Sequence, residues 1–160
     1  MGQGTECPWS EGVSFPDPAL EETIRAAIGK PEGEICSSHL IGLTDLYAMD
    51  RSISRLSGLE FCTGLEYISL ADNQISDLGP LAGLSRLTEL YVSNNQISDL
   101  EALSGLTNLR ILSLHTNQIS DIGPLEGLTN LLLLTVGSNQ VSDIGPLENL
   151  VNMVVMGENV

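Results

Sequence analysis

Apolar and polar residues alternate in short runs that return every 22 residues along most of the chain. One full unit, residues 106–127, reads LTNLRILSLHTNQISDIGPLEG, and Ser113 separates its apolar residues Leu112 and Leu114. Alternation with a period of two is typical of a short β-strand that turns one face to the core. The other repeats carry the same apolar pair: Ile68/Leu70, Leu90/Val92 and Leu134/Val136. The pattern therefore predicts one short strand per repeat.

Polar residues also hold fixed places in four successive repeats. They are Asn73, Asn95, Asn117 and Asn139, and Asp77, Asp99, Asp121 and Asp143. An inward-pointing amide satisfies backbone groups at a bend, where no strand partner exists. An aspartate before a turn accepts hydrogen bonds from backbone N–H groups. We therefore interpret both sets as parts of the scaffold, and a cation site at the aspartates is the alternative.

The segment that returns to the next strand is too short for a long helix. Only seven residues lie between each asparagine and the next fixed leucine, as between Asn117 and Leu125, and they include Asp-Ile-Gly-Pro turn chemistry. A 3₁₀ or irregular return leg is expected. Successive strands must then run in the same direction. The prediction is an α/β solenoid with a single parallel β-sheet on the concave face and 3₁₀ or irregular chain on the convex side.

The chain begins with a different pattern, which predicts a helical cap over residues 15–29. Asp17 is the expected N-cap, Pro18 the first helical residue, and Gly29 the residue that ends the helix. Leu20, Ile24 and Ile28 form one apolar stripe, which needs a surface to cover. A second short helix is expected to begin at Ser37 or Ser38. The domain prediction is a tail and helical cap over 1–42 and about five repeats over 43–160.

The first and last repeats depart from the pattern. Arg51 stands where the first repeat should have its asparagine, and Cys62 aligns with the core leucines. At the other end the 22-residue spacing assigns Val155 and Gly157 to the solvent-facing strand positions. An incomplete last repeat exposes apolar core. We therefore expect the chain to be a fragment of a longer solenoid, and a frayed last strand is the alternative.

Charge and hydropathy exclude several classes of partner. The chain has 6 basic and 21 acidic residues, for a net charge of −15, and no lysine or arginine follows Arg110. Nucleic acid and anionic lipid are not expected partners, because binding to phosphate depends on Lys and Arg. No apolar run is long enough to cross a membrane, so no membrane insertion is expected. The acidic surface provides solubility, or alternatively it attracts a basic partner or divalent cations.

The cysteines and histidines do not form a recognisable metal motif. Cys7, Cys36 and Cys62 lack CxxC spacing, and neither His39 nor His115 has a partner at zinc-ligand spacing. No metal or cofactor is therefore expected. Because Cys62 occupies a core position, Cys7 and Cys36 remain as candidates for a disulfide, which would require an oxidising compartment; two free thiols are the alternative.

No catalytic constellation is expected either. His115 has Ser93 and Ser113 as neighbours in the predicted sheet, but no buried carboxylate is placed to orient it. The carboxylates follow the repeat spacing, so they do not form an isolated acid–base pair. The sequence therefore predicts a protein that is not an enzyme.

Candidate binding residues occupy the strand positions that face away from the core, and all three tyrosines of the protein are among them. Tyrosine is favoured in binding sites because it combines apolar area with a polar tip. Tyrosine and isoleucine are also good strand formers, so exposure alone does not require a partner. The predicted binding residues are Tyr47, Tyr67, Glu89, Tyr91, Ile111, His115 and Leu133.

The repeat motif LTNLxxLxLxxNQISDIxPLxGL closely resembles the 22-residue repeats of bacterial internalin-type leucine-rich-repeat proteins. The segments FPDPALEETIRAAIGK and LSGLEFCTGL resemble the helical cap and first repeat of bacterial surface proteins with these domains. The resemblance covers about residues 15–157. It implies a leucine-rich-repeat solenoid, a secreted or cell-surface location, and protein–protein recognition on the concave sheet.

Two other functions stay open at this point. The chain is either a structural spacer within a larger surface protein, or an intracellular regulatory scaffold similar to the phosphatase-regulating class with 22-residue repeats. Those scaffolds usually lack the Asp-Ile-x-Pro-Leu return leg. The sequence identifies no particular protein partner, because the fold alone does not specify a ligand.

Overall fold

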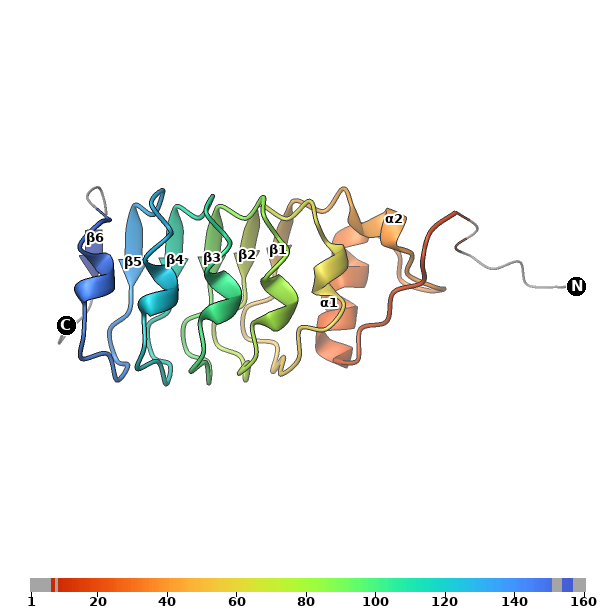
Figure 1. The fold of residues 1–160 in the computed structure, drawn as a ribbon. Helices are drawn as coiled ribbons and strands as arrows, with labels where there is room; N and C mark the ends of the chain where they lie inside the picture. The colour runs from red at the N-terminus through yellow and green to blue at the C-terminus, as the bar shows by residue number, and fades with distance from the viewer. Residues whose placement is uncertain (1–6, 8, 151–153, 157–160) are drawn as a thin grey trace, which may run out of the picture.

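The computed structural model describes residues 7, 9–150 and 154–156, and it forms a row of stacked turns with a helical cap at one end (Figure 1). The cap contains α1 (Pro18–Ile28) and α2 (Ser37–Leu40). Six three-residue strands follow: β1 (Asp45–Tyr47), β2 (Tyr67–Ser69), β3 (Glu89–Tyr91), β4 (Ile111–Ser113), β5 (Leu133–Thr135) and β6 (Val154–Met156). They make one parallel sheet in the order β1-β2-β3-β4-β5-β6, which confirms the predicted fold.

A 3₁₀ helix lies on the return leg of each repeat, on the side opposite the sheet (Figure 1). The five are η1 (Leu59–Phe61), η2 (Gly79–Leu81), η3 (Glu101–Leu103), η4 (Gly123–Leu125) and η5 (Gly145–Leu147). The backbone N–H of Gly79 donates to Asp77 Oδ1 at 2.7 Å, and Glu101, Gly123 and Gly145 repeat this contact at 2.8 Å. The predicted role of the aspartates in the outer turns is thereby confirmed.

Leucine side chains from the strands and the return legs fill the space between the two sides. Leu46, Ile68, Leu90, Leu112 and Leu134, the central residues of β1 to β5, are fully buried. Cys62 is also fully buried, and burial raises the pKa of its thiol to about 12, with the charge of Glu60 adding to the effect. Cys62 therefore behaves as a small core residue.

The repeat asparagines bind the backbone at the bend after each strand, as predicted. The Nδ2 atom of Asn73 donates to the carbonyl oxygens of Leu70 and Ala48, at 2.9 and 2.8 Å. Its Oδ1 accepts from the backbone N–H of Ile53 at 2.9 Å. Asn95, Asn117 and Asn139 repeat these contacts one turn further along. Each asparagine therefore links two consecutive turns.

The cap covers the first repeat through α1 and the segment before it. Leu20 and Ile24 of the α1 stripe are fully buried, and Gly29 ends the helix in the left-handed conformation, with φ 66°. Phe15 lies against Gly58, where an added Cβ would come within 2.5 Å of its ring. Gly58 also has a φ of 103°, so both the backbone and the close packing require glycine there.

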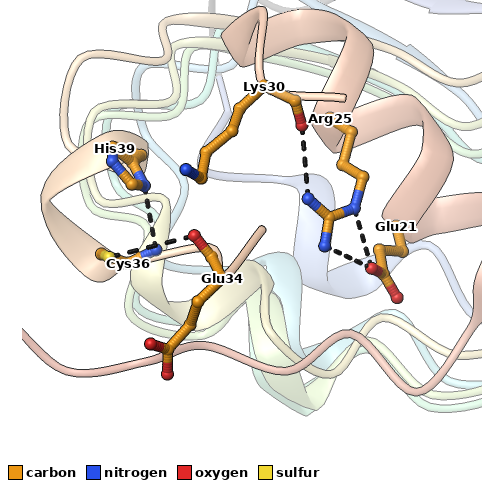
Figure 2. Close-up of polar contacts among 6 residues, drawn as sticks. All are labelled: Glu21, Arg25, Lys30, Glu34, Cys36 and His39. Atoms are coloured by element: carbon orange, nitrogen blue, oxygen red, sulfur yellow. Dashed lines mark hydrogen bonds and ion pairs between the residues drawn. The ribbon is translucent and has the colours of Figure 1, made fainter. Parts of the chain in front are cut away.

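Short-range polar contacts complete the cap (Figure 2). Arg25 on α1 donates to Glu21 Oε1 at 2.9 Å and to the carbonyl oxygen of Lys30 at 3.3 Å. The backbone N–H of Cys36, at the start of α2, donates to His39 Nδ1 at 3.0 Å. A disulfide joins Cys7 to Cys36, as the sequence allowed. It attaches the N-terminal segment to the cap.

The last strand corrects one sequence prediction. β6 pairs Val154 with Leu133 and Val155 with Leu134, so this repeat is 21 residues long instead of 22. Val155 therefore aligns with the core residues and not with the solvent-facing position predicted for it. The 22-residue spacing gave the wrong register here because no asparagine stands at the repeat position, four residues after β6. Gly157, the other residue predicted for this strand, lies outside the described residues.

Candidate recognition surface

The side of the sheet that faces away from the leucine core carries the first and third residues of each strand, and we call it the sheet face. The parallel register places equivalent residues of successive repeats next to each other. Tyr67, Glu89, Ile111 and Leu133 therefore form one line across β2 to β5, with Val154 next to Leu133. The predicted binding residues of the strands all lie on this face.

The three tyrosines are in contact with one another, and we call them the tyrosine row. The ring centroids of Tyr47 and Tyr67 are 5.0 Å apart, and those of Tyr67 and Tyr91 are 5.5 Å apart. Their rings meet diagonally, because Tyr67 pairs with Asp45 and Tyr91 pairs with Ser69. Tyr47 is 65% exposed and the other two are half-buried. The row is thus an ordered aromatic surface that is open to solvent at Tyr47.

Glu89 holds the end of the tyrosine row in place. The hydroxyl of Tyr91 donates to Glu89 Oε2 at 2.9 Å. Burial, followed by this hydrogen bond and the negative charge of Glu89, raises the pKa of Tyr91 to about 12. The phenol therefore stays protonated at neutral pH and keeps its hydrogen bond to the carboxylate. This contact fixes the orientation of the Tyr91 ring beside Tyr67.

Beyond β3 the sheet face becomes apolar. Ile111 and Leu133 pair with each other in register, but both are half-buried, so they present less surface than the sequence suggested. Val154 of β6 continues the line and is 54% exposed. The line of first strand residues is therefore aliphatic over β4 to β6, whereas the sheet face over β1 to β3 is mainly aromatic and acidic.

Hydroxyl groups form a second line that sequence reasoning did not identify. The side-chain oxygens of Ser93 and Ser113 are 2.7 Å apart, and those of Ser113 and Thr135 are 2.9 Å apart. The sequence does contain a signal for this line, because Ser113 and Thr135 both carry a hydroxyl group and occupy the same strand position in successive repeats. These groups satisfy each other, so they add to the order of the sheet face more than to its capacity to bind.

Other solvent-facing positions differ in how much surface they present. Ser69, Ala71 and Gly137 are buried, although their alternation with core residues places them on the side of the sheet face. Ser69 pairs with Tyr47 and Tyr91 in the sheet register, and these large neighbours account for its burial. His115 is exposed, and the structure places no carboxylate in hydrogen-bond contact with its imidazole among the described residues. His115 lies on the same side of the sheet as the tyrosine row. It follows β4, one repeat beyond Tyr91, so it is not part of the row.

A pocket of about 430 Å³ lies where α1 meets the first strand, and we call it the α1–β1 pocket. It is lined by Glu22, Thr23, Ala26, Ala27, Leu43, Asp45, Tyr47 and Arg51. The Thr44 hydroxyl donates to Asp45 Oδ2 at 2.6 Å. Tyr47 belongs both to this pocket and to the tyrosine row, so the two features are continuous.

Neither a metal-ligand cluster nor a membrane-spanning helix is found in the described part of the chain. Among residues 7, 9–150 and 154–156, no group of three His, Cys, Asp or Glu side chains is arranged to hold a metal ion. No helix in the same ranges is sufficiently long and apolar to cross a membrane. What the sheet face provides is aromatic, aliphatic and carboxylate side chains, half-buried or exposed, on strands in parallel register.

Comparison with known proteins agrees with this architecture. The family of leucine-rich repeats, in its two-copy form, matches residues 85–127 and again residues 107–149. The crystal structure of an internalin, InlF, from Listeria monocytogenes is 32% identical, covers 91% of this chain and 52% of its own, and has a TM-score of 0.72. No curated protein sequence matches the chain.

A second solved structure, the functional domain of InlJ from Listeria monocytogenes, is 19% identical and supports the fold alone. It covers 94% of this chain and 43% of its own, with a TM-score of 0.66. The chain thus spans about half the length of the internalins that it matches. These findings and the repeat geometry define the chain as a leucine-rich-repeat solenoid. Within that class it is a protein of the bacterial internalin type.

Proposed function

We propose that the chain is a non-catalytic module that recognises a protein partner through the sheet face. The observation that carries this proposal is the tyrosine row, three rings in contact at 5.0 and 5.5 Å on an otherwise solvent-facing sheet. Ordered tyrosines at the centre of an interface give large contact area at low entropic cost. The aliphatic line from Ile111 to Val154 extends the same surface by three strands.

Glu89 and His115 complete the proposed binding set. Glu89 accepts from Tyr91 through one carboxylate oxygen and retains acceptor capacity for a partner. His115 is exposed on the adjoining repeat. Polar groups around an aromatic centre are typical of the rim of an interface, where they contribute orientation and specificity. The proposed set is therefore an aromatic and aliphatic centre with a polar margin.

The proposed location is the surface of a bacterium or its exterior. Internalin-type relatives support this location, and so does the Cys7–Cys36 disulfide, because structural disulfides persist in oxidising compartments. The disulfide argues against the intracellular scaffold. Mass spectrometry of alkylated native protein tests this point, because free thiols at Cys7 and Cys36 would contradict an extracellular location.

The binding function is tested by screening the chain against a displayed library of extracellular protein domains and measuring affinity for the partner found. Changing Tyr67 and Tyr91 to alanine together should weaken binding by at least about 30-fold, because loss of even one hot-spot residue costs about 2 kcal/mol or more. Trp9→Ala is the matched control, since Trp9 is 96% exposed and belongs to the segment before α1 and not to a strand of the sheet. Trp9→Ala should leave the affinity unchanged.

The spacer function makes the opposite prediction for the same screen. A structural spacer would show no partner with a Kd below about 10 μM. A partner that binds the Tyr67→Ala/Tyr91→Ala variant as tightly as the original chain would also contradict the proposed surface.

A further inference from the structure

The α1–β1 pocket is the most enclosed place beside the tyrosine row. Thr23, Ala26 and Ala27 of α1 and Leu43 before β1 line it with small and aliphatic groups, and the ring of Tyr47 borders it. Its volume of about 430 Å³ is within the range in which proteins bind a small group closely. A long side chain with an apolar stem would therefore be accommodated between α1 and β1.

The charges around this pocket are unequal. Two carboxylates, Glu22 and Asp45, line it with a single guanidinium, that of Arg51. Neither carboxylate makes an ion pair with a residue that the structure describes, in contrast to Glu21 with Arg25 and Glu66 with Arg86. The Thr44 hydroxyl takes up one oxygen of Asp45 and leaves the other available. The pocket thus holds excess negative charge in a chain whose net charge is −15.

The ring of Tyr47, which borders the pocket, favours a positively charged ligand, as the excess negative charge does. Tyr47 is 65% exposed and lies at the end of the tyrosine row, on the edge strand β1, where its ring contacts that of Tyr67. A lysine ammonium or an arginine guanidinium within about 6 Å of a tyrosine ring is attracted by the electrons of its face. The same cation would be attracted by Asp45 on the same strand.

We propose that the α1–β1 pocket receives an arginine or lysine side chain of the protein partner, whose adjoining segment then follows the tyrosine row toward the aliphatic end of the sheet face. The inference rests on the proposed recognition function and specifies the chemistry of its partner. The apolar stem of the side chain packs on Leu43 and Ala26, and its charged end lies between the two carboxylates and the Tyr47 ring. Such side chains are well suited to a site with an apolar body and a polar margin.

The pocket is tested directly with N-acetyl-arginine amide as the probe and the ¹⁵N-labelled whole chain. Titration should shift the backbone amide signals of Ala26, Leu43 and Tyr47 in a saturable manner. N-acetyl-citrulline amide, which has nearly the same shape without the charge, should bind at least about fivefold more weakly. Equal binding of the two probes, or signal changes confined to other parts of the chain, would overturn the inference.

Matched variants separate the pocket from the overall charge. Glu22→Gln with Asp45→Asn should weaken binding of the arginine probe at least about fivefold, because both favourable charges are removed. Glu126→Gln with Glu148→Gln removes the same net charge from two exposed residues beside η4 and η5 and should leave the affinity unchanged. An equal loss in both double variants would show that the probe responds only to net charge and would refute the pocket.

Failure of this inference is distinguishable from failure of the proposed function. If the arginine probe does not bind, but the Tyr67→Ala/Tyr91→Ala variant still loses its partner, the sheet face is retained and the cationic anchor is wrong. If the probe binds, but the tyrosine variant keeps its partner, the pocket is retained and the sheet-face function is wrong.

Discussion

Each repeat asparagine makes its hydrogen bonds in two turns of the solenoid at once. Asn95 Nδ2 donates to Val92 O in its own turn at 3.1 Å and to Leu70 O in the preceding turn at 3.0 Å, and its Oδ1 accepts from the backbone N–H of Ile75 at 2.9 Å. The 22-residue spacing was sufficient to predict an inward amide. It could not predict which turn the amide would serve, because that depends on how the turns stack.

A single substitution tests this arrangement. Asn95→Ala leaves the part-buried Ile75 N–H without its partner, which costs about 1–3 kcal/mol. It also removes one of two donors to the Leu70 and Val92 carbonyls, which keep Asn73 and Asn117 respectively, and each lost hydrogen bond contributes about 0.5–1.5 kcal/mol. We expect the free energy of unfolding to fall by about 2–4 kcal/mol, measured by urea unfolding with circular dichroism. The adjacent Gln96 is exposed, so Gln96→Ala is the control and should change stability by less than about 0.5 kcal/mol. Similar losses for both variants would contradict the role of the amide.

At the scale of the element, α1 depends on a residue with two distinct roles. Asp17 Oδ1 accepts from the backbone N–H groups of Ala19 and Leu20 at 3.1 and 3.2 Å, as expected of an N-cap. Its Oδ2 accepts from the backbone N–H groups of Ser54 and Arg55 at 2.8 and 3.1 Å, which lie in the first repeat. Local sequence signals predicted the first role. The second joins residues that are distant in the chain and could not be predicted from a local pattern.

The Asp17 carboxylate therefore stabilises the docking of the cap in a pH-dependent way. Burial alone would raise its pKa, but hydrogen bonds from Ser54, Arg55 and Leu20 together hold it below its ordinary value of 3.8. A lowered folded-state pKa gives stability that is present above the ordinary value and is lost as pH falls through the folded-state value. The original chain should therefore lose its advantage over Asp17→Asn as pH decreases below about 4.

Thermal unfolding of the two proteins between neutral pH and acid provides the measurement. The comparison cancels the titration of the other carboxylates, which both proteins share. A difference in stability that stays constant with pH would show that the charge of Asp17 does not hold the cap.

At the scale of the whole molecule, the contacts run from each turn to its neighbours, with the cap at one end. The sequence predicted this arrangement almost completely, because the repeat constrains every turn in the same way. It predicted the sheet face less well, since burial there depends on the sizes of side chains in adjacent repeats. Ser69 is buried for this reason, between Tyr47 and Tyr91 in the register. The register of β6 departs from the 22-residue spacing in the repeat that lacks an asparagine at the fixed position.

Because each turn contacts mainly its neighbours, loss of a stabilising contact in the cap is expected to affect the cap and to leave the distant repeats unchanged. Serine in place of both Cys7 and Cys36 removes the disulfide and should lower stability by about 2–4 kcal/mol. In hydrogen–deuterium exchange, the amides of Val13 and Ser37, which pair with Ile35 O and Glu11 O, should exchange faster. Amides of β4 and β5 should keep their rates, because solenoid turns couple mainly to their nearest neighbours. Uniformly faster exchange would instead indicate one cooperative unit.

The repeat asparagines also make the two directions along the solenoid different. The Oδ1 atom of each asparagine accepts from the turn that precedes it in the chain, as from Ile53 to Asn73 and from Ile119 to Asn139. A turn is therefore completed by an amide that arrives 20 residues later. The first repeat has Arg51 where others have asparagine, and Asn73 binds its bend through the N–H groups of Arg51 and Ile53 and the carbonyl oxygen of Ala48. During synthesis on a ribosome the N-terminus emerges first. Each turn would therefore be completed only after the asparagine of the next turn has been synthesised, and folding would lag behind synthesis by one repeat.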